Sequence, residues 1–379
     1  MKVAFSTGRP AHVVLPANLL RQRGAEVTIY TAAYPARFRG VEPGVRFRWV
    51  PQLVATLHFL SGIQLPRPIQ RADTAMYDHL VGLRMDAYDL FWGWATGSLS
   101  AGRAARQRGA RFILDRACPH VDAQQRVIRT ECERLGVAYR PEPAWFHERQ
   151  LAEYEEADRI LVPSRYSADS FPAEMQSKIL IAPLFGRVPS APVETEAARP
   201  TRPFTFGTVG GQPLRKGFLY LLQAWERLRL PDARLLVRTD AALEDFPRLR
   251  ELLPRLPQVE IVGYQKNMSD FYRRCDAFVF PSVDDGFGMA LLEAMAHGLP
   301  SIATNRCGSS ELFRPATDLM VVPAQDAEAL AQAMAAIYES ADLRASLAAH
   351  AGQTLRAIEG AGVYGQYAAA LDRILASAD

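Results

Sequence analysis

The stretch DAFVFPSVDDGFGMALLEAMAHGLPSIAT, residues 276–304, contains the strand, loop and helix that decide the expected fold. Its apolar start, DAFVF, is typical of a strand buried on both faces, and the helix that follows begins near Met289 and stops at Gly298. Between them lie an acidic turn and two glycines, Gly286 and Gly288, which let backbone N–H groups approach a ligand closely. Because a helix N-terminus offers unpaired N–H donors and a partial positive charge, this stretch predicts a phosphate or diphosphate site.

Strands and helices alternate on both sides of this stretch, with short β-branched or aromatic runs followed by longer Ala-, Leu- and Arg-rich runs. Such alternation predicts an α/β fold with doubly wound parallel sheets. A proline-rich segment with almost no large apolar residues, residues 188–203, predicts a linker between two domains. We therefore expect two Rossmann-like domains facing each other across a cleft, residues 1–187 and 204–362, with a C-terminal helix at about residues 363–379 that packs back on the first domain.

The composition is that of a folded globular protein, with 379 residues, 49% of them hydrophobic and 22% charged. It excludes a disordered or coiled-coil chain, and no apolar run reaches the roughly 18 residues of a spanning helix. Residues 1–190 hold 25 basic and 18 acidic residues, against 19 and 23 in the remainder, although the net charge is only +3. The basic half is either a surface for an anionic partner such as a membrane or an ordinary solvated surface, and nucleic acid is not expected as a partner.

Several common motifs are missing. The four cysteines lie far apart with no CxxC, and the histidines show no metal-ligand spacing, so neither a disulfide framework nor a metal site is expected. No GxGxxG follows the first strand, Gly217 stands where a P-loop needs Ser or Thr, and no GxSxG occurs. The N-terminus lacks the pattern of a signal peptide, so we expect a cytoplasmic protein, with peripheral contact to the inner face of the membrane left open by the basic half.

Two further features could hold a ligand at the expected site. Glu293 lies in mid-helix among apolar residues, where it either accepts hydrogen bonds from ligand hydroxyls or points to solvent from a half-exposed helix. Arg215 and Lys216 follow a strand that ends in glycines and open an amphipathic helix, either as a diphosphate clamp or as an ordinary solvated turn. Asp285 either contributes to the ligand site or is simply an acid near a helix start, where it interacts favourably with the helix dipole.

Taken together, five segments between Glu153 and Pro323 resemble the family 4 retaining glycosyltransferases, which have the GT-B fold. Their order and spacing are specific to that family, whereas the N-terminal half matches only in layout. The segments are ADRILVPSRYSADSF (157–171), LRKGFLYLLQAW (214–225), DDGFGMALLEAMAHGLPSIAT (284–304), GSSELF (308–313) and DLMVVPAQD (318–326).

The resemblance implies a role for each matching position. Glu293 would hold the donor ribose, and Arg215 and Lys216 would neutralise the leaving diphosphate. Tyr264 falls where the family contacts the base, and His120 falls where it often has a histidine near the donor sugar, although a surface or capping histidine is the alternative. The residues expected to line the donor sugar and phosphates are Asp285, Gly286, Phe287, Gly288 and Met289. Of all these, His120, Lys216 and Asp285 are the expected catalytic residues.

The sequence departs from the family's pattern at three places. Asp285 stands where the first signature acid is usually Glu, and it is shorter by one methylene. Gly211 stands five residues before Lys216, where the family usually has an Arg, so Arg215 or another arginine must supply the second cation. The family's N-terminal glycine pair, expected to contact the donor, is reduced to Gly8.

The resemblance implies a retaining, metal-independent hexosyltransferase that needs no cofactor besides its nucleoside diphosphate sugar substrate. Its acceptor would be a glycan or lipid-linked saccharide, in bacterial cell-surface polysaccharide or glycoconjugate synthesis. The alternatives are another enzyme of the same fold, such as a nucleotide-sugar epimerase or a hydrolase, and a degenerate, non-catalytic binding subunit. Residues 46–71 would dock a membrane or pack on the first sheet, and Trp92 and Trp94 would stack on an acceptor sugar or pack in the core.

Overall fold

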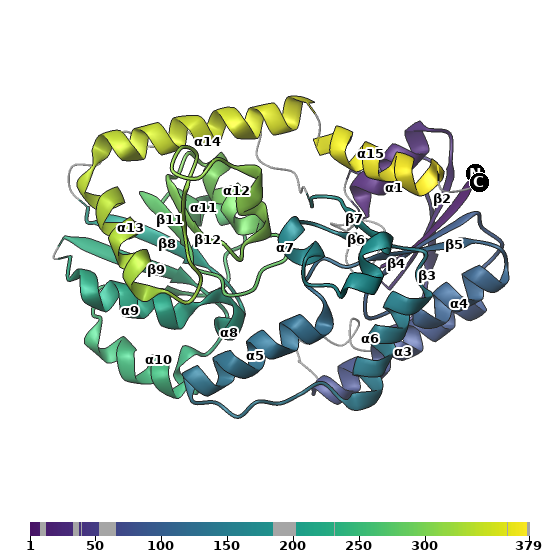
Figure 1. The fold of residues 1–379 in the computed structure, drawn as a ribbon, viewed down its shortest axis with the longest axis horizontal. Helices are drawn as coiled ribbons and strands as arrows, with labels where there is room; N and C mark the ends of the chain where they lie inside the picture. Colours follow the sequence, from purple (N-terminus) through teal and green to yellow (C-terminus); the bar gives the residue numbers. More distant parts are fainter. Residues whose placement is uncertain are drawn as a thin grey trace.

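The computed structural model describes residues 1–7, 13–32, 38, 40–52, 66–184, 202–230, 232–361 and 363–376. Within them the chain forms two parallel β-sheets, each with helices around it, which confirms the expected α/β class (Figure 1). Almost all of the segment predicted as a linker lies outside the described residues.

The N-terminal sheet has the strand order β3-β2-β1-β4-β5-β6-β7, and its neighbouring strands run parallel. Its strands are β1 (Lys2–Ser6), β2 (Glu26–Thr31), β3 (Arg46–Trp49), β4 (Leu90–Trp94), β5 (Arg111–Asp115), β6 (Arg159–Val162) and β7 (Ile179–Ile181). The helices described among them are α1 (Val14–Gln22), α3 (Arg67–Leu83), α4 (Leu99–Gln107), α5 (Val121–Leu135), α6 (Ala144–Glu156), α7 (Arg165–Ala168) and the 3₁₀ helix η3 (Ala173–Lys178).

The C-terminal sheet has the order β10-β9-β8-β11-β12-β13, again with parallel neighbours. Its strands are β8 (Phe204–Val209), β9 (Ala233–Arg238), β10 (Val259–Val262), β11 (Ala277–Phe280), β12 (Ser301–Thr304) and β13 (Met320–Val322). The helices among them are α8 (Pro213–Lys216), α9 (Phe218–Leu228), α10 (Pro247–Leu252), α11 (Met268–Tyr272), α12 (Met289–Ala296) and α13 (Ala327–Glu339), with the 3₁₀ helices η4 (Leu243–Asp245), η5 (Leu253–Arg255) and η6 (Gly308–Leu312).

Strand β11 shows why the central strands are uniformly apolar. Its residues alternate between two cores, because successive side chains of a strand point to opposite faces. Ala277 and Val279 lie in the cluster that contains helix α9, and Phe278 and Phe280 lie in the cluster that contains helix α12. Both faces of the sheet are therefore covered, and its carboxyl-end loops are the part left to bind a ligand.

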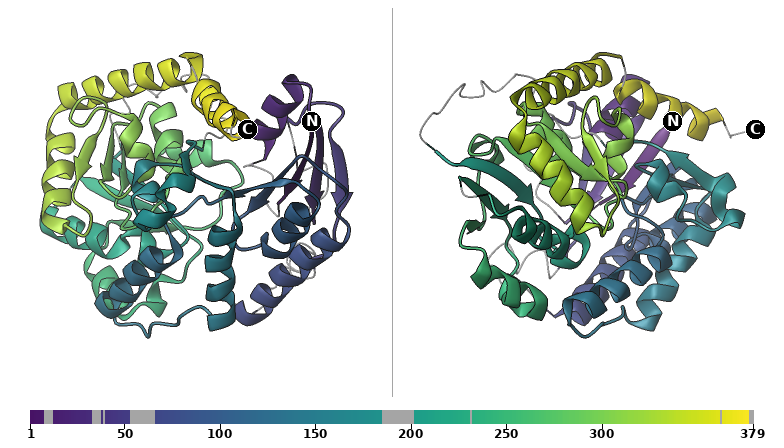
Figure 2. Two further views of the ribbon diagram at one scale, coloured as in Figure 1. Left: turned by 45° about the vertical axis from the view of Figure 1, so that its right-hand side comes forward. Right: turned by 60° about the vertical axis from the view of Figure 1, so that its left-hand side comes forward.

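The last two helices connect the domains. Helix α14 (Ala341–Ala361) runs along the C-terminal domain, and α15 (Val363–Ala376) lies beside α1 of the N-terminal domain (Figures 1 and 2). Tyr367 and Leu371 of α15 are buried in the same cluster as Phe5, and the Tyr367 ring stacks on Trp92 with centroids 6.2 Å apart. Trp92 is 2% exposed, so it packs in the core, and the alternative in which it stacks on an acceptor sugar is wrong.

Helix α5 also crosses between the domains, at its C-terminal end. Leu135 packs in the apolar cluster of the C-terminal domain, which places the end of this helix on that domain. Glu131, 1% exposed, accepts hydrogen bonds from the Tyr220 hydroxyl at 3.0 Å and from Gln325 Nε2 at 2.6 Å. These contacts fix the C-terminal end of α5 against the C-terminal domain.

Candidate active site

The carboxyl ends of β8 and β11 meet in the middle of the C-terminal sheet. The strands are neighbours, but the chain proceeds from β8 to β9 on one side and from β11 to β12 on the other. In open parallel sheets, ligands bind in the crevice that forms at such a switch point. The acidic, glycine-rich loop and the two adjacent cations predicted from the sequence both lie at this point.

The loop before α12 contains two glycines that could not be replaced without displacing neighbours. Gly288, the N-cap of α12, has φ of 88°, a left-handed conformation that favours glycine. A Cβ on Gly286 would lie 2.3 Å from the carbonyl oxygen of Ala117, which belongs to the N-terminal domain. The loop therefore approaches the opposite domain so closely that only a residue without a side chain fits at Gly286.

Arg215 and Lys216 end the short helix α8 and lie against the acidic loop. The N–H of Val283 donates to the Arg215 carbonyl oxygen at 2.8 Å, which fixes α8 to this loop. Arg215 Nε donates to Asp284 Oδ2 at 2.9 Å, and Lys216 Nζ forms an ion pair with Asp285. The sequence alternative of an ordinary solvated turn does not describe this arrangement, because both cations are largely buried and paired.

Asp285 is ionised at neutral pH. Burial alone would raise its pKa, but the charges of Lys216 and Arg215 outweigh burial and hold the pKa below its ordinary value. Two cations and two carboxylates thus balance their charges within the chain. An anionic ligand bound here competes with Asp284 and Asp285 for the same cations.

Glu293 is half-buried on α12 and has a partner within the chain. The hydroxyl of Tyr272 donates to its Oε2 at 2.8 Å, and burial raises the pKa of Glu293 above the ordinary value. Tyr272 thus supplies one of the donors that the sequence analysis expected from a ligand. The binding of a ribose by Glu293 stays a prediction.

His120 lies in the loop that follows β5 of the N-terminal domain, close in sequence to Ala117 and Cys118, which contact Gly286. It caps α5, because its Nδ1 accepts the N–H of Asp122 at 3.2 Å, so the capping alternative describes one of its nitrogens. The rings of Tyr154 and Phe171 enclose the imidazole, with centroids 4.9 and 5.0 Å away. Burial lowers the pKa of His120, which is therefore neutral at pH 7, and its buried Nε2 has no hydrogen-bond partner among the described residues.

A family comparison matches this part of the chain. The family described as "Glycosyl transferases group 1" matches residues 203–340, the segment that contains both cations, the glycine-rich loop and Glu293. The resemblance seen in the sequence is thereby confirmed.

Curated relatives and solved structures extend the comparison. The chain is 37% identical over 84 residues to the lipopolysaccharide core biosynthesis mannosyltransferase LpsB of Rhizobium meliloti, an alignment that covers 22% of this chain and 24% of that protein. The chain thus spans about a quarter of that relative's length. Sucrose-phosphate synthase from Thermosynechococcus elongatus superposes on this chain with a TM-score of 0.73 at 18% sequence identity. HepE from Anabaena, solved with UDP and glucose, superposes with a TM-score of 0.66 at 15% sequence identity. Both superpositions cover 100% of each chain, and they confirm the GT-B fold of two Rossmann-like domains.

Three contacts that join the C-terminal domain to the N-terminal domain were not predicted. The hydroxyl of Ser164, after β6, donates to the Gly286 carbonyl at 2.7 Å. The Glu311 carboxylate on η6 accepts the N–H groups of Arg165 and Tyr166, at 2.8 and 2.7 Å, and so caps helix α7 of the other domain. The Tyr166 hydroxyl donates to Asp284 at 3.0 Å. Ser164 and Glu311 lie in two segments quoted for the resemblance, but no spacing in the sequence indicates that these segments meet.

The other residues predicted to bind the donor differ in how exposed they are. Tyr264 follows β10 and is 74% exposed, so its ring is accessible to a ligand. The Phe287 side chain is 2% exposed and lies in the core cluster with Leu291, which leaves its backbone rather than its ring at the site. Met289 is half-buried at the first position of α12. Gly8 lies outside the described residues.

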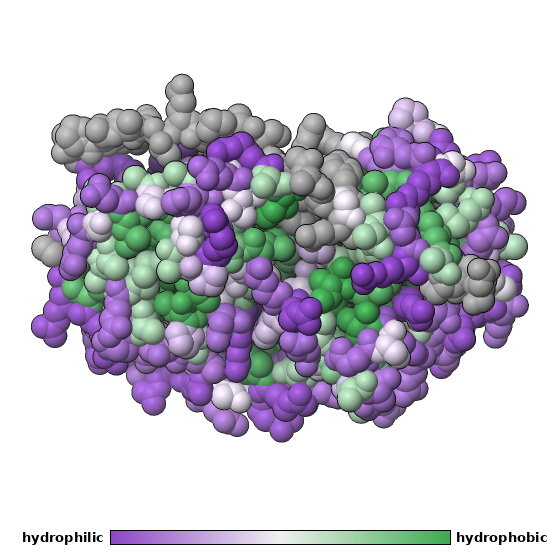
Figure 3. Space-filling view, turned by 45° about the horizontal axis from the view of Figure 1, so that its top comes forward, coloured by the Kyte–Doolittle hydropathy of each residue, from purple (hydrophilic) through white to green (hydrophobic). Residues whose placement is uncertain are grey.

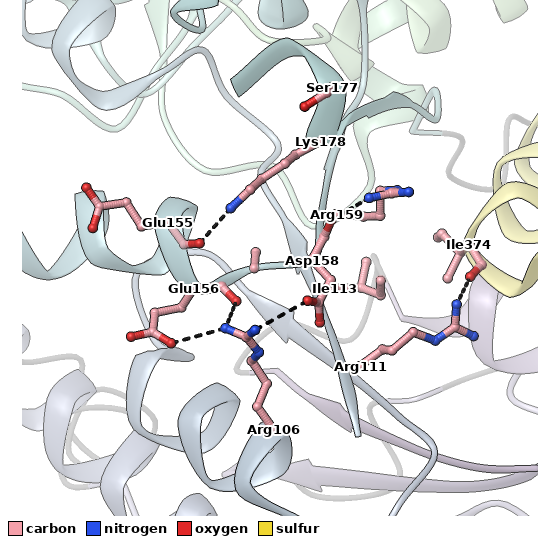
Figure 4. A pocket seen from close by; sticks show the side chains of 11 residues that line it. Arg106, Arg111, Ile113, Glu155, Glu156, Asp158, Arg159, Ser177, Lys178 and Ile374 are labelled. Carbon is pink, nitrogen blue, oxygen red and sulfur yellow. Dashed lines mark hydrogen bonds and ion pairs between the residues drawn. The ribbon is translucent and has the colours of Figure 1, made fainter. Parts of the chain in front are cut away.

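A cavity of about 510 Å³ lies in the N-terminal domain at the amino ends of β5 and β6, the edge of the sheet opposite to the one that bears His120 (Figure 4). Its cations have partners: Arg106 pairs with Glu156, Lys178 donates to the Glu155 carbonyl at 2.6 Å, and Arg111 donates to the Ile374 carbonyl. We interpret these contacts as structural, because they fasten the ends of α6 and α15 to the sheet.

Among the described residues, no helix is both long and apolar enough to cross a bilayer. On the face that bears α14 and α15, hydrophilic residues surround separate apolar clusters (Figure 3).

Proposed function

We propose that this protein is a retaining glycosyltransferase that moves a sugar from a nucleoside diphosphate sugar to a saccharide or lipid-linked acceptor. The supporting observation is the pair of buried cations at the switch point, beside the glycine-rich N-terminus of α12. The LpsB relative is a mannosyltransferase of lipopolysaccharide core synthesis, and HepE was solved with UDP and glucose. HepE favours a nucleotide-sugar donor, and LpsB favours a product of the lipopolysaccharide kind.

The main barrier to such a transfer is the separation of charge as the diphosphate leaves. In the proposed complex the donor diphosphate occupies the place between Lys216, Arg215 and the N-terminus of α12. These groups stabilise the negative charge that develops as the glycosyl C–O bond to the diphosphate breaks. Preorganised electrostatic stabilisation of this kind is usually the largest single term in catalysis.

The proposed transfer is balanced without a further reactant. The acceptor hydroxyl oxygen bonds to the anomeric carbon on the face from which the diphosphate departs, and its proton passes to an oxygen of the leaving diphosphate. The anomeric configuration is thereby retained. We assign Glu293 to the ribose hydroxyls, and His120 to a hydrogen bond between its Nε2 and the donor sugar, which its neutral state and unpartnered Nε2 support. The expectation that no metal ion is needed remains part of this proposal.

A panel of nucleotide sugars tests the proposal. We expect one of UDP-, GDP-, ADP- and dTDP-sugars to raise the melting temperature, since a ligand that binds only the folded state stabilises it. Incubation of that donor with candidate acceptors should then give a glycoside whose anomeric configuration, measured by NMR, equals that of the donor. Release of free sugar alone would favour a hydrolase, a changed nucleotide sugar an epimerase, and absence of all binding a non-catalytic subunit.

We also propose that the N-terminal domain touches an anionic membrane through one face of α3. Ile69, Met76 and Leu83 repeat every seventh residue on this helix and are 45%, 58% and 66% exposed, so they share one face. Two exposed arginines at the two ends of this helix, Arg67 and Arg84, supply charge complementary to acidic lipid.

Vesicle sedimentation tests this contact. The protein should pellet with phosphatidylcholine vesicles that contain phosphatidylglycerol, and less with pure phosphatidylcholine or at high salt. Met76→Asp combined with Leu83→Asp should abolish pelleting, whereas Ile261→Asp, which changes an exposed apolar residue of the other domain, should not. Equal pelleting of both variants would contradict this surface.

A further inference from the structure

An open space adjoins the predicted diphosphate site at Gly211. A Cβ placed on this residue would meet no atom within 4 Å. The neighbouring strand β9 ends beside this space at Arg238. Arg238 is in register with Val209 of β8, and its carbonyl oxygen accepts the N–H of Gly210 at 3.0 Å. Arg238 therefore borders the glycine loop directly.

The guanidinium of Arg238 is held in place by two contacts, but one of its N–H donors has no partner among the described residues. Its side chain is 13% exposed, and Nη1 lies 3.0 Å from the carboxylate of Asp240. Its Cζ lies 5.9 Å from the centroid of the Tyr264 ring, a cation–π contact with an aromatic ring that is itself 74% exposed. Nε is buried and has no hydrogen-bond partner among the described residues. A buried N–H donor without a partner costs free energy. A ligand acceptor that bonds to it therefore contributes more binding free energy than the same bond to a solvated arginine.

The strand order places Arg238 at one end of the proposed ligand. From α12 outward, the sheet edge presents β11, β8, β9 and β10, so Arg238 and Tyr264 follow the two strands farthest from the α12 N-terminus. Adjacent strands are about 4.8 Å apart, which places Arg238 one strand beyond the loop that adjoins Lys216. A nucleoside diphosphate with its phosphates at Lys216 therefore extends its base toward Arg238 and Tyr264.

The chemistry of the guanidinium limits which bases fit. It offers N–H donors in a fixed planar fork and no acceptor, so it pairs with carbonyl oxygens and ring nitrogens and is not satisfied by an amino group. We propose that Arg238, stacked on Tyr264, is a specificity residue that faces position 4 of a pyrimidine or position 6 of a purine. There it favours the carbonyl of uracil, thymine and guanine over the amino group of cytosine and adenine. This inference rests on the proposed use of a nucleotide sugar.

Calorimetric titration of the full chain with UDP, dTDP, GDP, CDP, ADP and inorganic pyrophosphate tests the assignment. At least one of UDP, dTDP and GDP should bind ten-fold or more tightly than CDP and ADP. Arg238→Gln should reduce that preference to within three-fold while leaving pyrophosphate affinity unchanged. Arg234→Ala, which removes another arginine of β9 that pairs with Glu260, is the matched control and should retain the preference. Unchanged melting temperatures without ligand would show that each variant is folded.

Two results would overturn the assignment while leaving the proposed function in place. One is tightest binding of ADP or CDP to the wild type. The other is an equal loss of affinity for all nucleotides and for pyrophosphate in Arg238→Gln, which would make Arg238 a phosphate-binding cation instead. A wild type that binds pyrophosphate and none of the nucleotides would remove both the assignment and the proposed function.

Discussion

In the C-terminal domain the buried acids Asp284 and Asp285 lie against cations, whereas in the N-terminal domain Asp115 and Glu153 are buried against N–H donors. The charges of Lys216 and its neighbour keep the pKa of Asp285 low, while burial raises the pKa of Asp115 and of Glu153 to about 7. The difference separates two uses of a buried carboxylate. One domain keeps a charged cluster at its ligand-binding edge, and the other holds in its core two acids, Asp115 and Glu153, that are partly protonated at neutral pH.

Removal of Lys216 is the strongest test of the charged cluster. Lys216→Ala should lower kcat of transfer by about 10²–10³-fold, the usual cost of losing one preorganised group that stabilises the transition state. Lys266→Ala, an exposed lysine of the same domain, is the control and should transfer at the wild-type rate. Steady-state kinetics with the best donor measure both variants. Near-wild-type kcat in a folded Lys216→Ala would remove this residue from the site.

Substitutions in the hydrogen-bonded pair of Tyr272 on α11 and Glu293 on α12 should give the next largest effect on transfer. Glu293→Ala should lower transfer severely, and Glu293→Gln should weaken nucleotide binding by about ten-fold, because a neutral amide replaces a charge-assisted acceptor, worth roughly 1.5–3 kcal/mol. Tyr272→Phe removes the hydroxyl that donates to Glu293 and should have a smaller effect. Titration calorimetry with the nucleoside diphosphate distinguishes the variants. A larger loss in Tyr272→Phe than in Glu293→Gln would mean that the pair is structural.

The contact between the domains should contribute less. Glu311→Ala removes the carboxylate that caps α7 across the cleft, and loss of a helix cap costs about 1 kcal/mol. We therefore expect kcat/KM to fall about five-fold through a less stable closed arrangement, with kcat for bound substrates less affected. Glu174→Ala, an acid in the first turn of η3, is a control that leaves the cleft unchanged. An unchanged kcat/KM in Glu311→Ala would mean that the cap does not position the domains.

The C-terminal domain was largely predictable from the sequence, because its motif is local. Residues 276–304 are contiguous, and the strand, acidic loop, glycines and helix follow in the order that the structure has. The pairing of Arg215 with Asp284 was not predictable, since it joins residues 69 apart through a sheet register that no spacing indicates. Trp92 shows the same limit in the N-terminal domain. Its partner Tyr367 lies on a helix from the other end of the chain, so the sequence could not decide between a core role and a ligand-binding role.

The two acids of the N-terminal domain with a raised pKa, Asp115 and Glu153, should affect stability rather than transfer. Asp115 accepts a hydrogen bond from Trp92 Nε1 at 3.2 Å, and burial raises its pKa from 3.8 to about 7. Between about pH 4 and 7 the unfolded chain has lost this proton and the folded chain keeps it, so the free energy of unfolding falls as the pH rises. Asp115→Asn cannot ionise and should flatten that decline, seen as a melting temperature that varies by a few degrees less over this range.

An exposed acid of the same domain serves as the control for the dependence of melting temperature on pH. Asp169→Asn alters an exposed acid of the same domain and should keep the wild-type slope of melting temperature against pH. Glu153 contributes a decline of the same sign, so Asp115→Asn should remove part of the slope and the combination with Glu153→Gln more of it. A wild-type slope in Asp115→Asn would show that Asp115 is ionised in the folded protein. The contrast between the two domains would then rest on Glu153 alone.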